Sequence, residues 1–87
     1  MASGPSADFQ AAADRVNGLS KDPGNDTKLR LYALYKQATQ GDVAGKRPGF
    51  TNPVGRAKYD AWAALAGTSS EQAEADYVAE AGRLTGA

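Results

Sequence analysis

Apolar residues recur at helical spacing in four segments of the chain, and no segment alternates apolar and polar residues over the length of a strand. The first segment runs from about Ala7 to Gly18, the second ends near Gln40, and the third runs from Pro53 to about Ala66. A fourth segment follows and carries its apolar residues along one side. The pattern therefore predicts an all-α fold, with stripes in the first and last helices at Phe9, Ala12, Ala13, Val16, Ala73, Tyr77, Ala81 and Leu84.

Turn-forming residues separate the first two helices and end the second. The sequence DPGN at 22–25 is typical of a turn, so Asn25 or Thr27 is expected to cap the second helix. Gly41 is expected to end that helix in a left-handed conformation. Residues 41–52 hold three glycines and a proline, which suit neither helical nor strand spacing. We expect an ordered crossover there.

The third and fourth helices carry their own boundary signals. Asn52 and Pro53 fit an N-cap and a first helical residue, because proline has no N–H to lose at that position. Gly67 is expected to end the third helix. Thr68 and Glu71 have the spacing of a capping box at the start of the fourth.

The amino-acid composition excludes several classes of function and says less about the fold. The chain has 87 residues with no cysteine and no histidine, so we expect one domain over 1–87 without disulfides, metal sites or histidine chemistry. Its carboxylates fit helix starts and solvated faces, and its glycine-rich stretch lacks a preceding strand, so we expect no enzyme and no cofactor. No run approaches a membrane span or a signal peptide, which favours a cytoplasmic protein rather than an integral membrane protein. A monomer is the default expectation.

The charge is unevenly distributed, although it sums to zero. Residues 28–58 carry seven basic side chains and one acidic side chain, a net charge of +6, against −2 and −4 on the two flanks. Tyr32, Tyr35 and Tyr59 lie in or beside this segment. Such a field attracts anions, and tyrosines offer flat faces to an aromatic ring. A nucleotide-bearing small molecule and a nucleic acid both fit, but the isoelectric point near 6.1 disfavours a nucleic-acid partner.

The second helix carries two stripes of residues, and packing in a core explains only the first, which is Leu31, Leu34, Tyr35 and Ala38. Leu29, Tyr32 and Lys36 lie on the other side, which suits a ligand with one apolar and one anionic end, although a solvated face gives the same pattern. Lys58 in the third helix is either a second phosphate ligand or a solubilising charge. Tyr35 falls on the core stripe, yet a tyrosine at a groove edge can bury its ring and still donate its hydroxyl.

Four further residues are assigned by their positions alone. Trp62 and Leu65 are expected in the core, and Lys46 and Arg47 at the rim of a site. The spacing leaves the role of Tyr77 open.

Three motifs in order complete the pattern: LYALYKQATQGDV at 31–43, RPG at 47–49 and GRAKYDAW at 55–62. With GTSSEQAEADYV at 67–78, they resemble the acyl-CoA-binding protein family over nearly the whole chain. The resemblance implies a four-helix, up-down-down-up bundle with a long crossover between the second and third helices. It also implies a non-catalytic protein that binds, buffers and transports medium- to long-chain fatty acyl-CoA and delivers it to enzymes. The alternative is an acyl-CoA-regulated protein-interaction module, and a helical nucleic-acid-binding domain is the least favoured reading.

The resemblance also implies roles for individual residues. The 3′-phosphate of the CoA ribose would be held by Tyr32, Lys36 and Lys58. The adenine and its neighbouring groups would contact Tyr35 and Tyr77, and the acyl channel would be bordered by Ala13 and Leu29.

Four positions depart from the family pattern. Asn17 stands where many relatives carry a basic residue near the ligand phosphates, which implies a lower affinity. Tyr59 replaces the usual tryptophan and keeps an aromatic surface. Lys28 and Arg30 are more polar than expected beside the acyl channel, so the preferred chain length is expected to differ.

Overall fold

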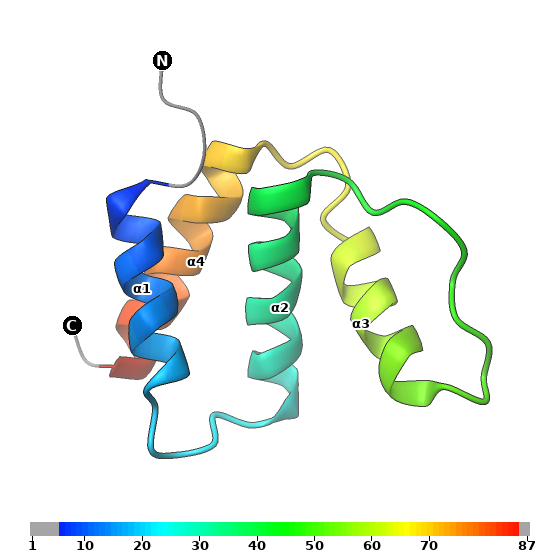
Figure 1. Ribbon diagram of the computed structural model, residues 1–87, viewed down its shortest axis with the longest axis horizontal. Coiled ribbons are helices and arrows are strands. Elements are labelled where there is room, and N and C mark those ends of the chain that lie inside the picture. The colour runs from blue at the N-terminus through cyan, green and yellow to red at the C-terminus, as the bar shows by residue number, and fades with distance from the viewer. Residues whose placement is uncertain (1–5, 86–87) are drawn as a thin grey trace.

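The computed structural model describes residues 6–85, and in that part of the chain it contains four α-helices and no strand. The helices are α1 (Ala7–Asn17), α2 (Asn25–Gln40), α3 (Pro53–Ala63) and α4 (Ser70–Thr85), as Figure 1 shows. None of these helices is long and apolar enough to cross a bilayer.

The helices form a thin layer rather than a square bundle, with extents of 37 × 36 × 15 Å. Helix α4 packs against α1 and α2, while α3 packs only against α2. Figure 1 shows α2 and α3 running in the same direction, with α1 and α4 running opposite to them. This is the up-down-down-up order, and the long segment 41–52 is required because two parallel helices cannot be joined by a short turn. The all-α fold class is confirmed.

The core lies where α1, α2 and α4 meet. Phe9, Leu34 and Ala12 are fully inaccessible to solvent, and Ala73 and Ala81 of α4 face them. Alanines on these faces let the helix axes approach closely around the one buried phenylalanine ring. Helix α3 contributes no fully buried residue, so its position depends on polar contacts described below.

Several predicted helix boundaries are confirmed. The Asn52 side chain accepts a hydrogen bond from the Gly55 N–H at 3.1 Å, and Pro53 is the first helical residue. A Cβ atom on Gly55 would lie 2.5 Å from the Asn52 side chain, so this cap requires a glycine three residues on. Gly41 ends α2 with a φ of 82°, where its N–H donates to the Gln37 carbonyl.

The start of α2 differs from the prediction. Neither Asn25 nor Thr27 caps it, because Gly24 occupies the N-cap position with a φ of 97° and no side chain supplies the cap. The carboxylate of Asp22 instead accepts a hydrogen bond from the Gly24 N–H at 2.8 Å. The preceding turn therefore sets the entry into the helix.

The link between α3 and α4 also differs. Helix α3 ends at Ala63 rather than near Ala66, because residues 64–67 tighten into turns that lead to Gly67 at a φ of 90°. The cap of α4 is Ser69, whose Oγ accepts a hydrogen bond from the Gln72 N–H at 3.1 Å. The Thr68 carbonyl is used elsewhere, as an acceptor for a side chain of α2.

Candidate functional site

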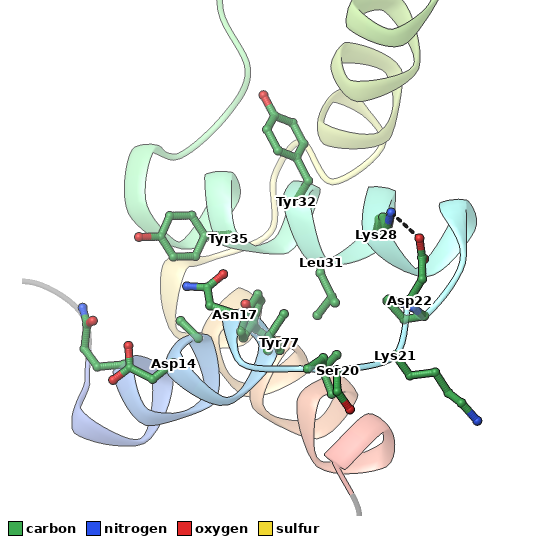
Figure 2. A pocket seen from close by; sticks show the side chains of 15 residues that line it. Asp14, Asn17, Ser20, Lys21, Asp22, Lys28, Leu31, Tyr32, Tyr35 and Tyr77 are labelled. Atoms are coloured by element: carbon green, nitrogen blue, oxygen red, sulfur yellow. Dashed lines mark hydrogen bonds and ion pairs between the residues drawn. The ribbon is translucent and has the colours of Figure 1, made fainter.

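A groove of about 680 Å³ opens between α1, the 18–24 connection and α2. Its lining mixes apolar side chains with the polar side chains Gln10, Asp14 and Asn17 of α1, and it becomes mostly polar at the connection. Figure 2 shows Leu31, Tyr35 and Tyr77 at the groove, and Lys28 paired with Asp22 near the connection. The apolar wall is formed by Ala13, Val16, Leu19 and Leu31, and the polar end by Ser20, Lys21, Asp22 and Lys28.

Three aromatic rings support the base of this groove. Tyr35 stacks on Phe9 with ring centroids 5.4 Å apart, and Tyr77 meets Phe9 edge-on at 5.1 Å. Tyr77 is 4% exposed, so it belongs to the core, whereas Tyr35 is 41% exposed at the groove edge. Tyr35 therefore has an open ring face that a planar ligand group can contact.

The Tyr77 hydroxyl remains a neutral donor. Burial raises the pKa of Tyr77 above its ordinary value, and the nearby Tyr35 raises it further. This hydroxyl forms no hydrogen bond within residues 6–85, and no fully buried polar atom there is left unpaired. The Tyr77 oxygen consequently reaches the groove, where it can donate to a ligand.

Two lysines from different helices converge on Tyr32. The Nζ of Lys36 lies 5.9 Å from the centroid of the Tyr32 ring, and the Nζ of Lys58 lies 5.3 Å from it. Figure 2 shows the Tyr32 ring projecting from α2 towards α3. Neither ammonium forms an ion pair with a carboxylate of the described residues. Two unneutralised cations near one phenol ring favour an anionic group at this place.

Three other basic side chains of the 28–58 segment, Lys28, Arg30 and Arg47, are neutralised in the fold. Arg47 binds both carboxylate oxygens of Asp60, at 2.8 and 2.7 Å. The Arg47 guanidinium lowers the pKa of Asp60, and the same pair raises the pKa of Arg47. Arg30 lies 3.5 Å from Glu80. Arg47 was expected at the rim of a site, but it ties the crossover to α3 instead.

A polar network holds α3 beside α2 and thereby places Lys58. Gln37 is only 1% exposed, and its amide donates to Asp42 and to the Thr68 carbonyl, each at 2.8 Å. The Trp62 indole N–H donates to the Gln37 side chain at 3.1 Å and to the Gly41 carbonyl at 2.8 Å. The Gly67 N–H and then the Gln37 amide lower the pKa of Asp42.

The position of Trp62 corrects an expectation. It was placed in the core with Leu65, but it is only partly buried and uses its N–H in the network just described. Its ring also faces Lys36, whose Nζ lies 5.4 Å from the ring. Leu65 does pack against the core cluster. Trp62 therefore links the lysine pair to the crossover.

The candidate ligand residues occupy two adjoining places. Lys36 and Lys58 lie outside the groove and meet at Tyr32, which belongs to both places. Leu29 is partly buried on α2 and does not line the groove. The remaining candidates all line the groove: Ala13, Asn17, Tyr32, Tyr35 and Tyr77.

The ion pair at the polar end of the groove was missed as a feature of the site. Lys28 and Asp22 lie 2.8 Å apart and both line the groove. The Lys28 ammonium and the Gly24 N–H lower the pKa of Asp22. A signal was present in the sequence, because two opposite charges flank a tight turn at 22–25.

Comparisons with known proteins give a consistent result. A family model described as acyl CoA binding protein matches residues 6–81. The acyl-CoA-binding protein of Ricinus communis is 46% identical over 79 residues, which is 91% of this chain and 88% of that protein. The crystal structure of Oryza sativa acyl-CoA-binding protein 2 has 44% sequence identity and a TM-score of 0.84, covering 88% of this chain and 86% of that one.

A second kind of relative is longer. Enoyl-CoA delta isomerase 2 of Rattus norvegicus is 52% identical over 71 residues, which is 82% of this chain. The matched segment makes up only 18% of the isomerase, and the same fraction of the human protein. The similarity therefore covers one part of those proteins.

Proposed function

Because the chain belongs to the acyl-CoA-binding protein family, we propose that it binds medium- to long-chain fatty acyl-CoA without transforming it. Residues 1–87 form one acyl-CoA-binding domain in this proposal. The protein buffers and transports the thioester in the cytoplasm as a monomer, and enzymes that use acyl-CoA receive it. No cofactor takes part.

The observation that carries the proposal is the convergence of Lys36 and Lys58 on Tyr32. Two ammonium groups near one ring raise the free energy of the empty site unless an anion occupies it. The 3′-phosphate of CoA supplies that anion, and the Tyr32 hydroxyl donates to it. Because Tyr32 also borders the groove, a ligand with a phosphate at one end reaches the apolar wall with the other.

The rest of the ligand is assigned to the groove. The adenine contacts the open face of Tyr35 and receives a hydrogen bond from Tyr77. The acyl chain passes Ala13 within the groove and extends to Leu29, which lies on α2 outside the groove lining. Asn17 supplies a neutral amide at the groove wall, so the phosphates there meet one cation fewer than a lysine would provide.

Calorimetric titration with octanoyl-, dodecanoyl- and palmitoyl-CoA tests this function, with free CoA and an oligonucleotide as controls. Affinity should rise with chain length over the medium range, because each buried CH₂ contributes at most about 0.8 kcal/mol. Equal affinity for all thioesters and free CoA would show that no acyl groove operates. Binding of the oligonucleotide alone would replace the proposal with nucleic-acid binding.

One observation favours a second candidate, an acyl-CoA-regulated interaction module. The matching segment of enoyl-CoA delta isomerase 2 is part of a much longer protein, so a domain of this kind also occurs joined to other sequence. A carrier gives up its ligand to an acyl-CoA-consuming enzyme without a stable complex, whereas a module forms a complex whose affinity depends on the ligand. Sedimentation of the loaded and empty protein with such an enzyme distinguishes the two.

A further inference from the structure

Two large apolar side chains are held in water at one corner of the molecule. Phe50 is 83% exposed and Val54 is 65% exposed, and they are four positions apart where the crossover enters α3. The one other exposed large apolar side chain of the described residues is Tyr35, which borders the groove. Phe50 and Val54 line no part of that groove and have no role in the proposed function.

This corner projects away from the main core. Helix α3 packs on α2 alone, and Figure 1 shows the crossover bending into α3 on the side of the molecule far from α1. No other segment of residues 6–85 covers the two side chains.

The crossover displays Phe50 on a fixed backbone. The Asn52 N–H donates to the Gly49 carbonyl at 2.9 Å, which closes a turn around Phe50. The Tyr59 hydroxyl donates to the Gly45 carbonyl at 3.1 Å, so α3 also holds the earlier part of the crossover. Because the backbone at Phe50 is already held, contact with a partner costs less ordering entropy than it would for a flexible loop.

The charge near this corner is mostly positive, and the nearest carboxylate along α3 is Asp60, which pairs with Arg47 and also lies within electrostatic range of Arg56. Residues 43–59 contain four basic side chains and no carboxylate. Arg47 is neutralised by Asp60. The other three form no ion pair within residues 6–85, and they are Lys46, Arg56 and Lys58.

We propose that this corner, comprising Phe50, Val54, Lys46 and Arg56, binds the surface of an anionic lipid bilayer. Phe50 and Val54 enter the headgroup region, and the basic side chains contact lipid phosphates and carboxylates. Two side chains are too few to bury the roughly 800 Å² per partner of a stable protein interface. An exposed aromatic ring with unpaired cations on the same segment of the chain suits weak, reversible attachment to an anionic membrane instead.

Co-sedimentation with vesicles tests the proposal. The protein should bind vesicles of phosphatidylcholine mixed with phosphatidylserine, bind pure phosphatidylcholine far less, and lose binding as salt rises. Phe50→Ser should weaken partition roughly tenfold. Lys46→Gln and Arg56→Gln should each weaken it about fivefold. The matched control is Arg15→Gln, which removes an exposed charge from α1 and should leave partition unchanged.

The outcomes that overturn the proposal are distinct. Equal binding to both vesicle types, an unaffected Phe50→Ser variant, or an equal loss in Arg15→Gln would each refute it. A dimer in lipid-free sedimentation that Phe50→Ser abolishes would assign the corner to a second copy of the chain. Val54→Ser is a second apolar variant with the same expected direction. The affinity for octanoyl-CoA should be unchanged in Phe50→Ser. A negative result in the vesicle experiment would therefore refute membrane binding without affecting the proposed acyl-CoA binding.

Discussion

Replacing Lys36 or Lys58 with alanine should weaken binding of an acyl-CoA but hardly change binding of the matching 3′-dephospho thioester. Both ammonium groups lie within 6 Å of the Tyr32 ring, and neither pairs with a carboxylate of residues 6–85. A phosphate placed between them forms a charge-assisted hydrogen bond to each. Dephospho-CoA lacks that phosphate, so removing a lysine removes no contact with this ligand and should hardly change its affinity.

The magnitude follows from the surroundings of each lysine. A charge-assisted contact that is partly shielded from water contributes about 1.5 to 3 kcal/mol, which is about ten- to 150-fold in Kd. Lys36 is partly buried between the rings of Tyr32 and Trp62, so its loss should fall towards the upper end. Lys58 is exposed, so solvent screening should keep its loss near the lower end.

The assay is calorimetric titration of each variant with octanoyl-CoA and with 3′-dephospho-octanoyl-CoA at one ionic strength. The double variant should lose less than the sum of the two single losses, because both lysines act on one phosphate. Tyr32→Phe should lose less than either lysine variant. Lys46→Ala is the matched control, since it removes an exposed crossover lysine that does not line the groove and does not lie over the Tyr32 ring. If both ligands lose affinity equally, the lysines sense general charge and the phosphate assignment is refuted.

Three further outcomes are expected. Gln37→Leu should lower the free energy of unfolding by about 1 to 3 kcal/mol in urea titrations, because it removes the hydrogen bonds that the buried Gln37 amide donates to Asp42 and to the Thr68 carbonyl. An unchanged midpoint would show that the network is dispensable. Burial raises the pKa of Tyr77 above 10.0, so the folded state holds the phenol proton more tightly than the unfolded state does. The stability of the fold should therefore be intact below pH 10 and fall above it. In thermal melts across this range, Tyr77→Phe should reduce that fall. Lys28→Leu should tighten palmitoyl-CoA binding by up to about fourfold for each CH₂ of the acyl chain that reaches the polar end of the groove. The affinity for octanoyl-CoA should stay unchanged. Equal changes for both ligands in calorimetry would mean that the acyl chain does not reach Lys28.

Much of the secondary structure could be predicted because its signals are local. Asn52 and Pro53 start α3, and Gly41 ends α2, since caps and glycines act on their own few residues. The predictions failed where two local solutions compete. Thr68 and Ser69 are both good caps, and the choice of Ser69 leaves the Thr68 carbonyl to accept a bond from α2. That bond comes from a residue 31 positions away, so local sequence signals do not reveal it.

The candidate site shows the same division. Its residue types and the two-faced pattern of α2 are visible in the sequence, and the family resemblance assigned the groove residues to it. The exposure of Trp62 was not visible, because a tryptophan on an apolar stripe packs in most cores. Here the indole instead satisfies the Gly41 carbonyl at the end of α2, 21 positions earlier in the chain.

The sequence alone determined the four helices, their apolar faces and an excess of positive charge in the middle of the chain. The tertiary structure decided which of those charges are cancelled and which remain. Arg30 meets Glu80 of α4, and Arg47 meets Asp60 of α3, while Lys36 and Lys58 are left beside Tyr32 without a carboxylate. Charge interactions depend on distance in space, and a sequence records only distance along the chain.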